Sequence, residues 1–253
     1  MKILLKPIQW LYCIYALLAF IGIMFLALPF VLVAVFFGKI KGGNFIYKVV
    51  KTWGFAWYFL VGIKHEVQYE ADHDATRQYI FVANHISYMD IPPVVMTLHQ
   101  PVRVLAKYEL SKLPVFGFIY KSAAIMVDRS DPGKRAESVQ QMKQYIRKHI
   151  SVFIFPEGTF NETPQPLKSF FDGAFRIAIE TQTPIKPLLF VDTIDRMHYG
   201  SFFSLTPGKC RVVFLNEVPV AALTINDLPA LKQQVYNLMD AGLRRYRTYP
   251  LFE

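Results

Sequence analysis

The chain has 253 residues, a formal net charge of +9 and a pI near 9.4. Its lysines and arginines are dispersed and lie beside an apolar segment, so attraction to anionic lipid explains the charge more simply than binding of nucleic acid. Two cysteines, Cys13 and Cys210, do not make a disulfide framework. The sequence has no glycine-rich phosphate loop and no histidines at metal-ligand spacing, which gives no support to nucleotide hydrolysis or to a metal site.

The N-terminal segment carries no charged residue between positions 7 and 38. This run is longer than the ~20 apolar residues that a helix needs to cross a bilayer. Lysines flank it on both sides, so the positive-inside rule does not choose an orientation. Three arrangements stay open: a re-entrant hairpin broken near Pro29, a single tilted span, and a helix buried in the globular domain. A second apolar stretch, residues 53–63, is short for a span and favours an interfacial helix.

We therefore predict a membrane-associated helical segment over residues 1–64 and a catalytic domain over residues 65–253. Within the second part, short apolar runs predict strands near residues 78–83, 123–127, 151–155, 185–191 and 210–215. Helical stretches separate these strands: Asp131 and Pro132 begin one such helix, and Asn226 begins the last. The alternation predicts an α/β fold.

The segment after the first of these strands holds a histidine and an aspartate five residues apart, His85 and Asp90. On a continuous helix these positions lie about 140° apart, so the pair needs a turn between them. Two prolines, Pro92 and Pro93, suit the first turn of a helix and place Asp90 at its start, with the carboxylate able to reach back to His85. Such a pair can act as a general base with a carboxylate partner. The alternative is an ordinary N-cap beside a structural histidine.

A second strand, near residues 151–155, leads into a turn that carries a carboxylate, Pro156-Glu157-Gly158-Thr159. By itself this pattern fits a surface turn equally well.

Together these motifs resemble the signature blocks of the glycerolipid acyltransferases typified by 1-acyl-sn-glycerol-3-phosphate (lysophosphatidic acid) acyltransferase. That family's first block, Asn-His followed by Asp, is matched by Asn84, His85 and Asp90. Its third block, Phe-Pro-Glu-Gly-Thr, stands at residues 155–159.

The other two blocks stand in the expected order. Residues 124–129 are similar to the second block, an apolar strand ending in an arginine, although Ala124 replaces the usual glycine. Residues 184–187 match the fourth block, a Pro-Ile-x-Pro strand entry. The resemblance covers about residues 75–215, and four blocks in order are far more specific than one.

The resemblance implies a mixed central sheet flanked by helices, behind the N-terminal membrane-anchoring segment. It also implies an O-acyltransferase of phospholipid biosynthesis at the cytoplasmic membrane, with its active site facing the cytoplasm. A fatty acyl group would pass from acyl-CoA or acyl carrier protein, as co-substrate, to the hydroxyl of a lysophospholipid. The foremost acceptor is 1-acyl-sn-glycerol-3-phosphate, which would become phosphatidic acid. Neither metal nor cofactor is expected.

In this scheme His85 and Asp90 are catalytic, with His85 as general base and Asp90 fixing its tautomer. The expected substrate-binding residues are Asn84, Lys107, Arg129, Glu157, Gly158 and Thr159. Backbone N–H groups after His85 or around Gly158 are candidate donors to the thioester oxyanion.

One departure concerns the acceptor. Family members that use lysophosphatidic acid usually continue the third block with an arginine, where this chain has Phe160. An aromatic ring cannot replace a guanidinium on a phosphate, so this contact falls to Arg129, with Lys107 or Lys168, or the acceptor is another lyso-lipid. A thioesterase-like hydrolase and a catalytically silent lipid-binding protein are the alternatives of other classes.

Overall fold

A computed structural model describes residues 2–128 and 131–249, with side chains from residue 6 onward. Its helices are α1 (Lys2–Val35), α2 (Gly43–Leu60), α3 (Ile91–Thr97), α4 (Phe116–Ala123), α5 (Pro132–Ile146), α6 (Gly173–Thr181), α7 (Thr193–Arg196) and α8 (Leu228–Tyr246). Its strands are β1 (Ile63–Tyr69), β2 (Ile80–Ala83), β3 (Val102–Lys107), β4 (Ala124–Val127), β5 (Ser151–Ile154), β6 (Ile185–Phe190) and β7 (Gly208–Phe214).

The strands form one mixed sheet in the order β1-β7-β6-β2-β5-β3-β4. β6, β2, β5, β3 and β4 run parallel to one another, whereas β7 is antiparallel to β6 and pairs in parallel with β1. The parallel centre brings the C-terminal ends of β2, β5 and β6 to one edge, where α/β proteins place their ligands. The predicted mixed α/β sheet is confirmed.

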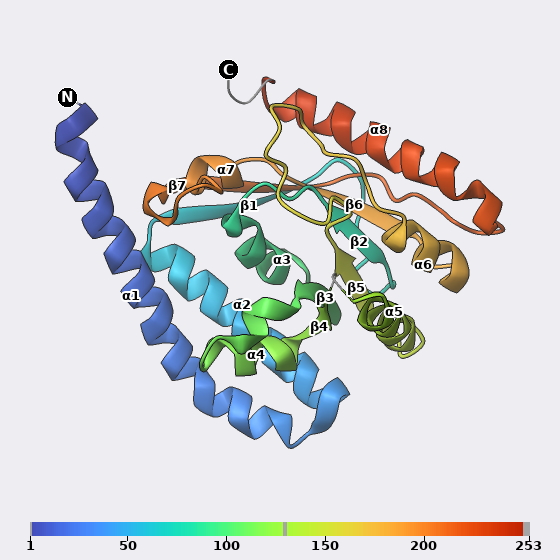
Figure 1. The fold of residues 1–253 in the computed structure, drawn as a ribbon, viewed down its shortest axis with the longest axis horizontal. Coiled ribbons are helices and arrows are strands. Elements are labelled where there is room, and N and C mark those ends of the chain that lie inside the picture. The colour runs from blue at the N-terminus through green and yellow to red at the C-terminus, as the bar shows by residue number, and fades with distance from the viewer. Residues whose placement is uncertain (1, 129–130, 250–253) are drawn as a thin grey trace.

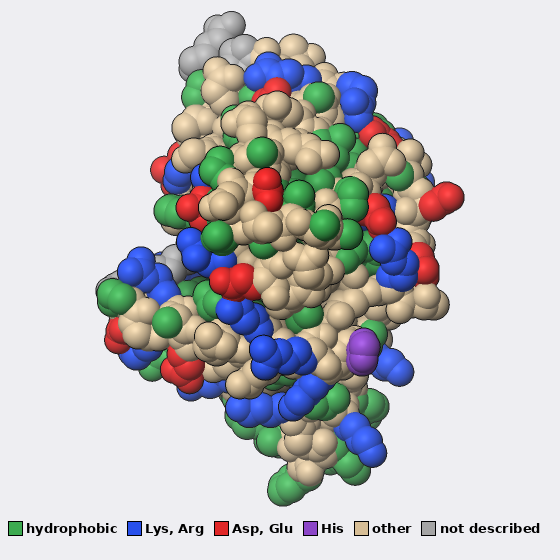
Figure 2. Space-filling model, turned by 90° about the vertical axis from the view of Figure 1, so that its right-hand side faces the viewer, with side chains coloured by type: hydrophobic (Ala, Val, Ile, Leu, Met, Phe, Trp, Pro, Cys, Tyr) green, Lys and Arg blue, Asp and Glu red, His purple; other side chains and the backbone are tan. Residues whose placement is uncertain are grey.

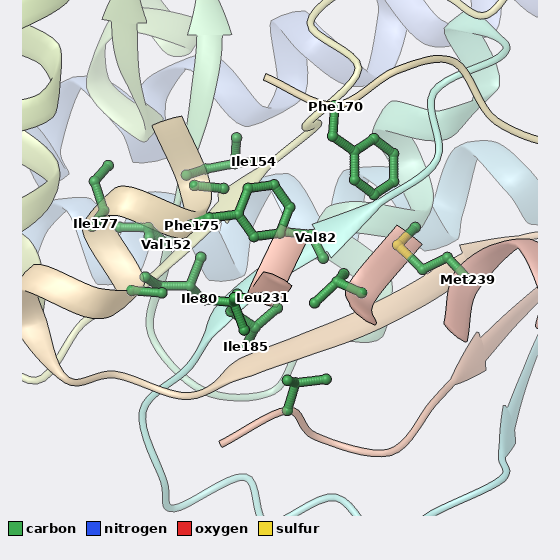
Figure 3. Close-up of a cluster of buried hydrophobic side chains, with 14 of the residues drawn as sticks. Ile80, Val82, Val152, Ile154, Phe170, Phe175, Ile177, Ile185, Leu231 and Met239 are labelled. Carbon is green, nitrogen blue, oxygen red and sulfur yellow. The ribbon is translucent and has the colours of Figure 1, made fainter. Parts of the chain in front are cut away.

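Helices cover both faces of the sheet (Figure 1). Side chains alternate along a strand, so Ile80 and Val82 of β2 face the cluster under α5, α6 and α8, while Phe81 faces the opposite cluster. Figure 3 shows part of the first cluster, in which Phe175 of α6 and Met239 of α8 meet the strands. The strands at the centre are therefore buried on both sides.

The five predicted strands are all present, but β1 and β3 were not predicted. β1 carries four polar side chains among its seven residues, and it lies at the edge of the sheet. β3 has Arg103 at its second position, and this arginine is only 1% exposed. Neither strand shows the continuous apolar run of the others. Two predicted helix starts are confirmed. Asp131 caps α5, and the last helix, α8, begins just after Asn226.

α1 and α2 form a helical hairpin that is closed by the short π-helix Gly38–Gly42. The hydroxyl of Tyr12 donates to the carbonyl of Val61, and the indole of Trp57 donates to the carbonyl of Ala16, so the two helices run side by side. Because α1 continues through Pro29, the predicted break at Pro29 is wrong. The chain reverses after α1 ends at Val35, and Gly42 of the π-helix fits against the carbonyl of Ala34.

One helix of the described chain, Lys6–Val35, is long and apolar enough to cross a membrane. Only 22% of its most apolar window is buried in the protein, so the alternative of a helix buried in the globular domain is wrong. The inner side of the hairpin packs on the rest of the chain through a cluster that includes Trp53, Met96 and Cys210. The predicted division between residues 64 and 65 stays a prediction.

Basic side chains are unevenly spread on the face that carries α5, α6 and α8. Figure 2 shows several Lys and Arg side chains gathered just below the middle of this face. Further basic side chains lie at the turn of the hairpin. Lys39 and Lys41 of that turn are exposed beside Phe36 and Phe37. Basic and aromatic side chains in this combination suit an anionic lipid surface.

Candidate active site

The turn after β2 holds His85 and Asp90 in contact. The Nδ1 atom of His85 lies 2.8 Å from Oδ2 of Asp90, as the sequence predicted. The same oxygen accepts hydrogen bonds from the backbone N–H groups of Ile86 (2.7 Å) and Ser87 (2.9 Å). Asp90 is fully buried, and its other oxygen, Oδ1, has no partner among the described residues. The chain is therefore bent around one carboxylate oxygen.

This contact decides which nitrogen of His85 is available for chemistry. An ionised carboxylate only accepts hydrogen bonds, so Nδ1 carries the proton and Nε2 is left as the basic atom. The imidazole stacks on Phe155 at 3.9 Å between ring centroids and meets the edge of Phe160 at 4.4 Å. The exposed fraction of the His85 side chain is 16%. The imidazole ring is thus held by Asp90 at Nδ1 and by the rings of Phe155 and Phe160.

Asn84 ties the start of this turn to β6. Its Nδ2 donates to the carbonyl of Phe190 at 2.9 Å, and its Oδ1 accepts from the N–H of Phe190 at 2.8 Å. Asn84 is buried and uses both ends of its amide on the backbone. The structure therefore gives Asn84 a positioning role beside His85 and Asp90.

Glu157 joins the second motif to the first. Its Oε1 accepts from the N–H of His85 at 2.8 Å, and its Oε2 accepts from the N–H of Lys168 at 2.9 Å. Glu157 is fully buried, and this burial raises the pKa of its carboxyl to about 8. These contacts are those of a residue that organises two loops, and its predicted contact with the substrate stays a prediction.

Around Glu157, the loop presents polar groups toward solvent. Gly158 has φ +76°, a conformation that favours glycine and turns the chain outward. Thr159 is exposed, and its Oγ1 accepts a hydrogen bond from Nζ of Lys168 at 2.7 Å. The ammonium group of Lys168 therefore lies against Thr159, the residue that precedes Phe160.

Of the remaining two predicted residues, the structure describes only Lys107. Arg129 lies outside the residues that the structure describes. Lys107 is exposed at the end of β3, where its ammonium lies 3.8 Å from the carboxylate of Glu109.

The predicted oxyanion donors are already engaged. The N–H groups of Ile86 and Ser87 donate to Asp90, that of His85 donates to Glu157, and that of Gly158 donates to the carbonyl of Phe155. Those of Ile86, Ser87 and Gly158 serve the fold of their own turns, and that of His85 ties its turn to the distant Glu157. The prediction of oxyanion donors after His85 or around Gly158 stays a prediction. Within the described ranges, no group of three or more His, Cys, Asp or Glu side chains could hold a metal ion.

No motif in the sequence predicted that the segment between α7 and β7 contributes to the site. The hydroxyl of Ser87 donates to the carbonyl of Met197 at 2.5 Å, so this segment lies directly against the turn that holds His85 and Asp90. Phe202 in the same segment packs on Tyr88 at 4.6 Å between ring centroids. These partners are more than a hundred residues apart in the chain, and the only signal was the adjacent pair Phe202 and Phe203.

Comparisons with known proteins agree on one family. The family model described as Acyltransferase matches residues 64–191. The 1-acyl-sn-glycerol-3-phosphate acyltransferase alpha of Mus musculus is 30% identical over 192 residues, which is 75% of this chain and 67% of the relative. The Homo sapiens protein of the same name is 29% identical over the same shares. The crystal structure of the 1-acyl-sn-glycerophosphate acyltransferase PlsC from Thermotoga maritima aligns with a TM-score of 0.72, 22% identity and 97% of both chains, which shows a shared fold.

Proposed function

This chain belongs to the acyltransferase family, and we propose that it acylates the free hydroxyl of a lysophospholipid with an acyl thioester as donor. The foremost acceptor is 1-acyl-sn-glycerol-3-phosphate, the substrate in the names of the relatives, and the product would be phosphatidic acid. The donor would be acyl-CoA or acyl carrier protein. The observation that carries the proposal is the 2.8 Å contact between His85 and the buried Asp90.

His85 acts as the general base. Its Nε2 takes the proton of the acceptor hydroxyl while that oxygen attacks the thioester carbonyl. When the tetrahedral intermediate collapses, the carbon–sulfur bond breaks and the leaving thiolate receives the proton from Nε2. Between these steps the imidazole is a cation, and the carboxylate of Asp90 stabilises it at Nδ1.

Recognition of the acceptor phosphate is assigned to Lys168. Its ammonium is held by Thr159 at 2.7 Å, and its backbone N–H shares the Glu157 carboxylate with the N–H of His85. Lys168 therefore supplies a positive charge in the loop where relatives place an arginine, although only as a point charge rather than a bidentate fork. The ring of Phe160, which faces His85 at 4.4 Å, favours a second candidate acceptor, a lyso-lipid with a less charged head group.

The site works at a membrane surface in this proposal. The exposed apolar side of α1 enters the bilayer. The basic side chains at the hairpin turn contact anionic headgroups. We place the protein at the cytoplasmic membrane with His85 on the cytoplasmic side, where acyl-CoA or acyl carrier protein is available.

The decisive experiment uses full-length protein in lipid nanodiscs with both donors and a panel of lysophospholipids. Acylated product and free fatty acid are measured for the wild type and for His85→Ala. We expect conversion of lysophosphatidic acid to phosphatidic acid and a loss of about 10²–10⁴-fold in His85→Ala, the usual contribution of a positioned general base. The matched control is His149→Asn, a change at an exposed histidine with φ +56° that asparagine tolerates.

Each other outcome points to a different function. Acylation of only another lyso-lipid would assign the acceptor shift to Phe160. Free fatty acid without acylated product would indicate a hydrolase. Turnover that is absent, or that persists unchanged in His85→Ala, would refute the proposed reaction.

A further inference from the structure

A row of aromatic rings connects the catalytic turn with the N-terminal helix. Tyr88 lies 4.8 Å from Phe160, which itself packs on His85, and Phe202 lies 4.6 Å from Tyr88, all between ring centroids. The next residue in the chain, Phe203, lies 5.8 Å from Trp10 of α1. The aromatic strip is defined as Phe160, Tyr88, Phe202, Phe203 and Trp10.

The backbone beneath the strip is tied down at both ends. Near the catalytic turn, the hydroxyl of Ser87 donates to the carbonyl of Met197. Near α1, the thiol of Cys13 lies 3.8 Å from the carbonyl of Leu205. The segment that carries Phe202 and Phe203 therefore spans from the catalytic turn to α1, as the connection between α7 and β7 in Figure 1 also shows.

The strip is apolar and open. Tyr88 is 41% exposed, Phe202 62%, Phe203 52% and Trp10 57%. Ring contacts join Phe160, Tyr88 and Phe202, and Phe203 with Trp10, and the two groups meet at the adjacent residues 202 and 203. Large apolar side chains exposed together mark a surface that meets another molecule. At its far end the row joins α1, whose outer side chains such as Leu11 and Leu18 are also exposed. The strip thus continues the surface that faces lipid chains and ends at the catalytic base.

The chemistry of the acceptor fits this geometry. In a lysophospholipid the free hydroxyl and the acyl ester sit on the same glycerol unit, so the acyl chain begins within a few bonds of the oxygen that His85 must reach. The acceptor already lies in a lipid leaflet, and an apolar path from α1 lets its chain stay out of water throughout. The donor arrives on a water-soluble carrier and has no need of that entrance.

We propose that the aromatic strip holds the acyl chain of the lysophospholipid acceptor and guides it from the bilayer at α1 to His85. This inference rests on the proposed function and deepens it, because it makes Phe202 and Phe203 determinants of the affinity for the acceptor.

The test compares the double variant Phe202→Ser/Phe203→Ser with the wild type on a long-chain and on a short-chain, water-soluble form of the same lysophospholipid. The variant is expected to raise KM for the long-chain acceptor about tenfold, since two rings lose apolar contact with the chain. The KM of the donor, the kcat and the activity on the short-chain acceptor stay at wild-type values. Phe202→Leu/Phe203→Leu keeps most of the apolar surface and should restore KM.

Phe118→Ser is the control, because Phe118 is 40% exposed on α4 and belongs to another surface. A raised KM for the donor would assign the strip to the donor chain and overturn the inference. Equal losses on both acceptors, a lowered melting temperature that accounts for the loss, or no change in KM would overturn it too.

A second measurement does not depend on turnover. A lysophospholipid with a diazirine at the end of its acyl chain is photo-crosslinked to the wild type in nanodiscs, and the labelled peptides are mapped. Label on residues 202–203 supports the strip, and label confined to other segments overturns it. If the wild type acylates no lysophospholipid, the proposed reaction fails while this experiment still decides whether the strip binds the chain.

Discussion

Replacing Asp90 by asparagine separates the charge of this residue from its shape. The carbonyl of an asparagine can take the place of Oδ2 and keep the hydrogen bonds from the N–H groups of Ile86 and Ser87. What disappears is the negative charge opposite the imidazolium that forms on His85. Catalysis should therefore fall much more than stability.

The size of the effect follows from the 2.8 Å separation of Nδ1 and Oδ2. With an effective dielectric constant of about 20, two unit charges at this distance attract by about 6 kcal/mol. The imidazole carries between roughly half a charge and a full charge in the transition state, so about 3–6 kcal/mol of stabilisation is at stake, or ~10²–10⁴ in rate. This range overlaps the usual contribution of general-base catalysis.

The assay is the initial rate of lysophospholipid acylation by Asp90→Asn, with thermal unfolding measured on the same preparation. Asp240→Asn is the control, because Asp240 forms a surface ion pair with Arg244 on α8. We expect the control to keep full activity and Asp90→Asn to melt close to the wild type. Activity of Asp90→Asn within about threefold of the wild type, below the contribution expected of a general base, would refute the role of its charge. A drop in activity that is matched by unfolding would refute the separation of charge from shape.

Three further predictions concern stability, pH and the acceptor. Burial raises the pKa of Glu157 to about 8 from an ordinary 4.5. Between these two pH values the folded protein keeps the carboxyl proton, whereas the unfolded chain releases it. The free energy of unfolding therefore falls as the pH rises from 4.5 to about 8, by up to about 1.4 kcal/mol per pH unit. Thermal melts at pH 5 and 8 should show a smaller loss of stability with pH in Glu157→Gln than in the wild type. An equal loss in both proteins would contradict the raised pKa of Glu157. Arg103→Met should lower the free energy of unfolding by about 2–4 kcal/mol, because the guanidinium donates to the carbonyl of Lys39 and to the side chain of Asn44 at the hairpin turn; denaturant melts of this variant that coincide with the wild type would contradict that role. Lys168→Gln should raise KM for lysophosphatidic acid about tenfold with little change for an uncharged lyso-lipid, and equal effects on both acceptors would remove Lys168 from phosphate recognition.

The sequence by itself determined the parts of this protein that depend on neighbouring residues. The contact between His85 and Asp90 could be predicted, because five residues and two following prolines leave the chain one turn in which the side chains meet. The start of α5 followed from the aspartate and proline at 131 and 132, and the central strands followed from their apolar runs. An uncharged run beginning at residue 7 was enough to identify the helix at the N-terminus as long and apolar enough to span a membrane.

Only the tertiary structure decided what joins distant segments. Glu157 holds the N–H of His85 across 72 residues, and Asn84 holds β6 across 106. Such contacts leave no local pattern, because either side chain would look the same in a surface turn. The N–H groups of Ile86 and Ser87 are bound by Asp90 inside their own turn, whereas that of His85 is bound by the distant Glu157. The aromatic strip, likewise, exists only because the fold lays α1 and the segment before β7 beside the catalytic turn.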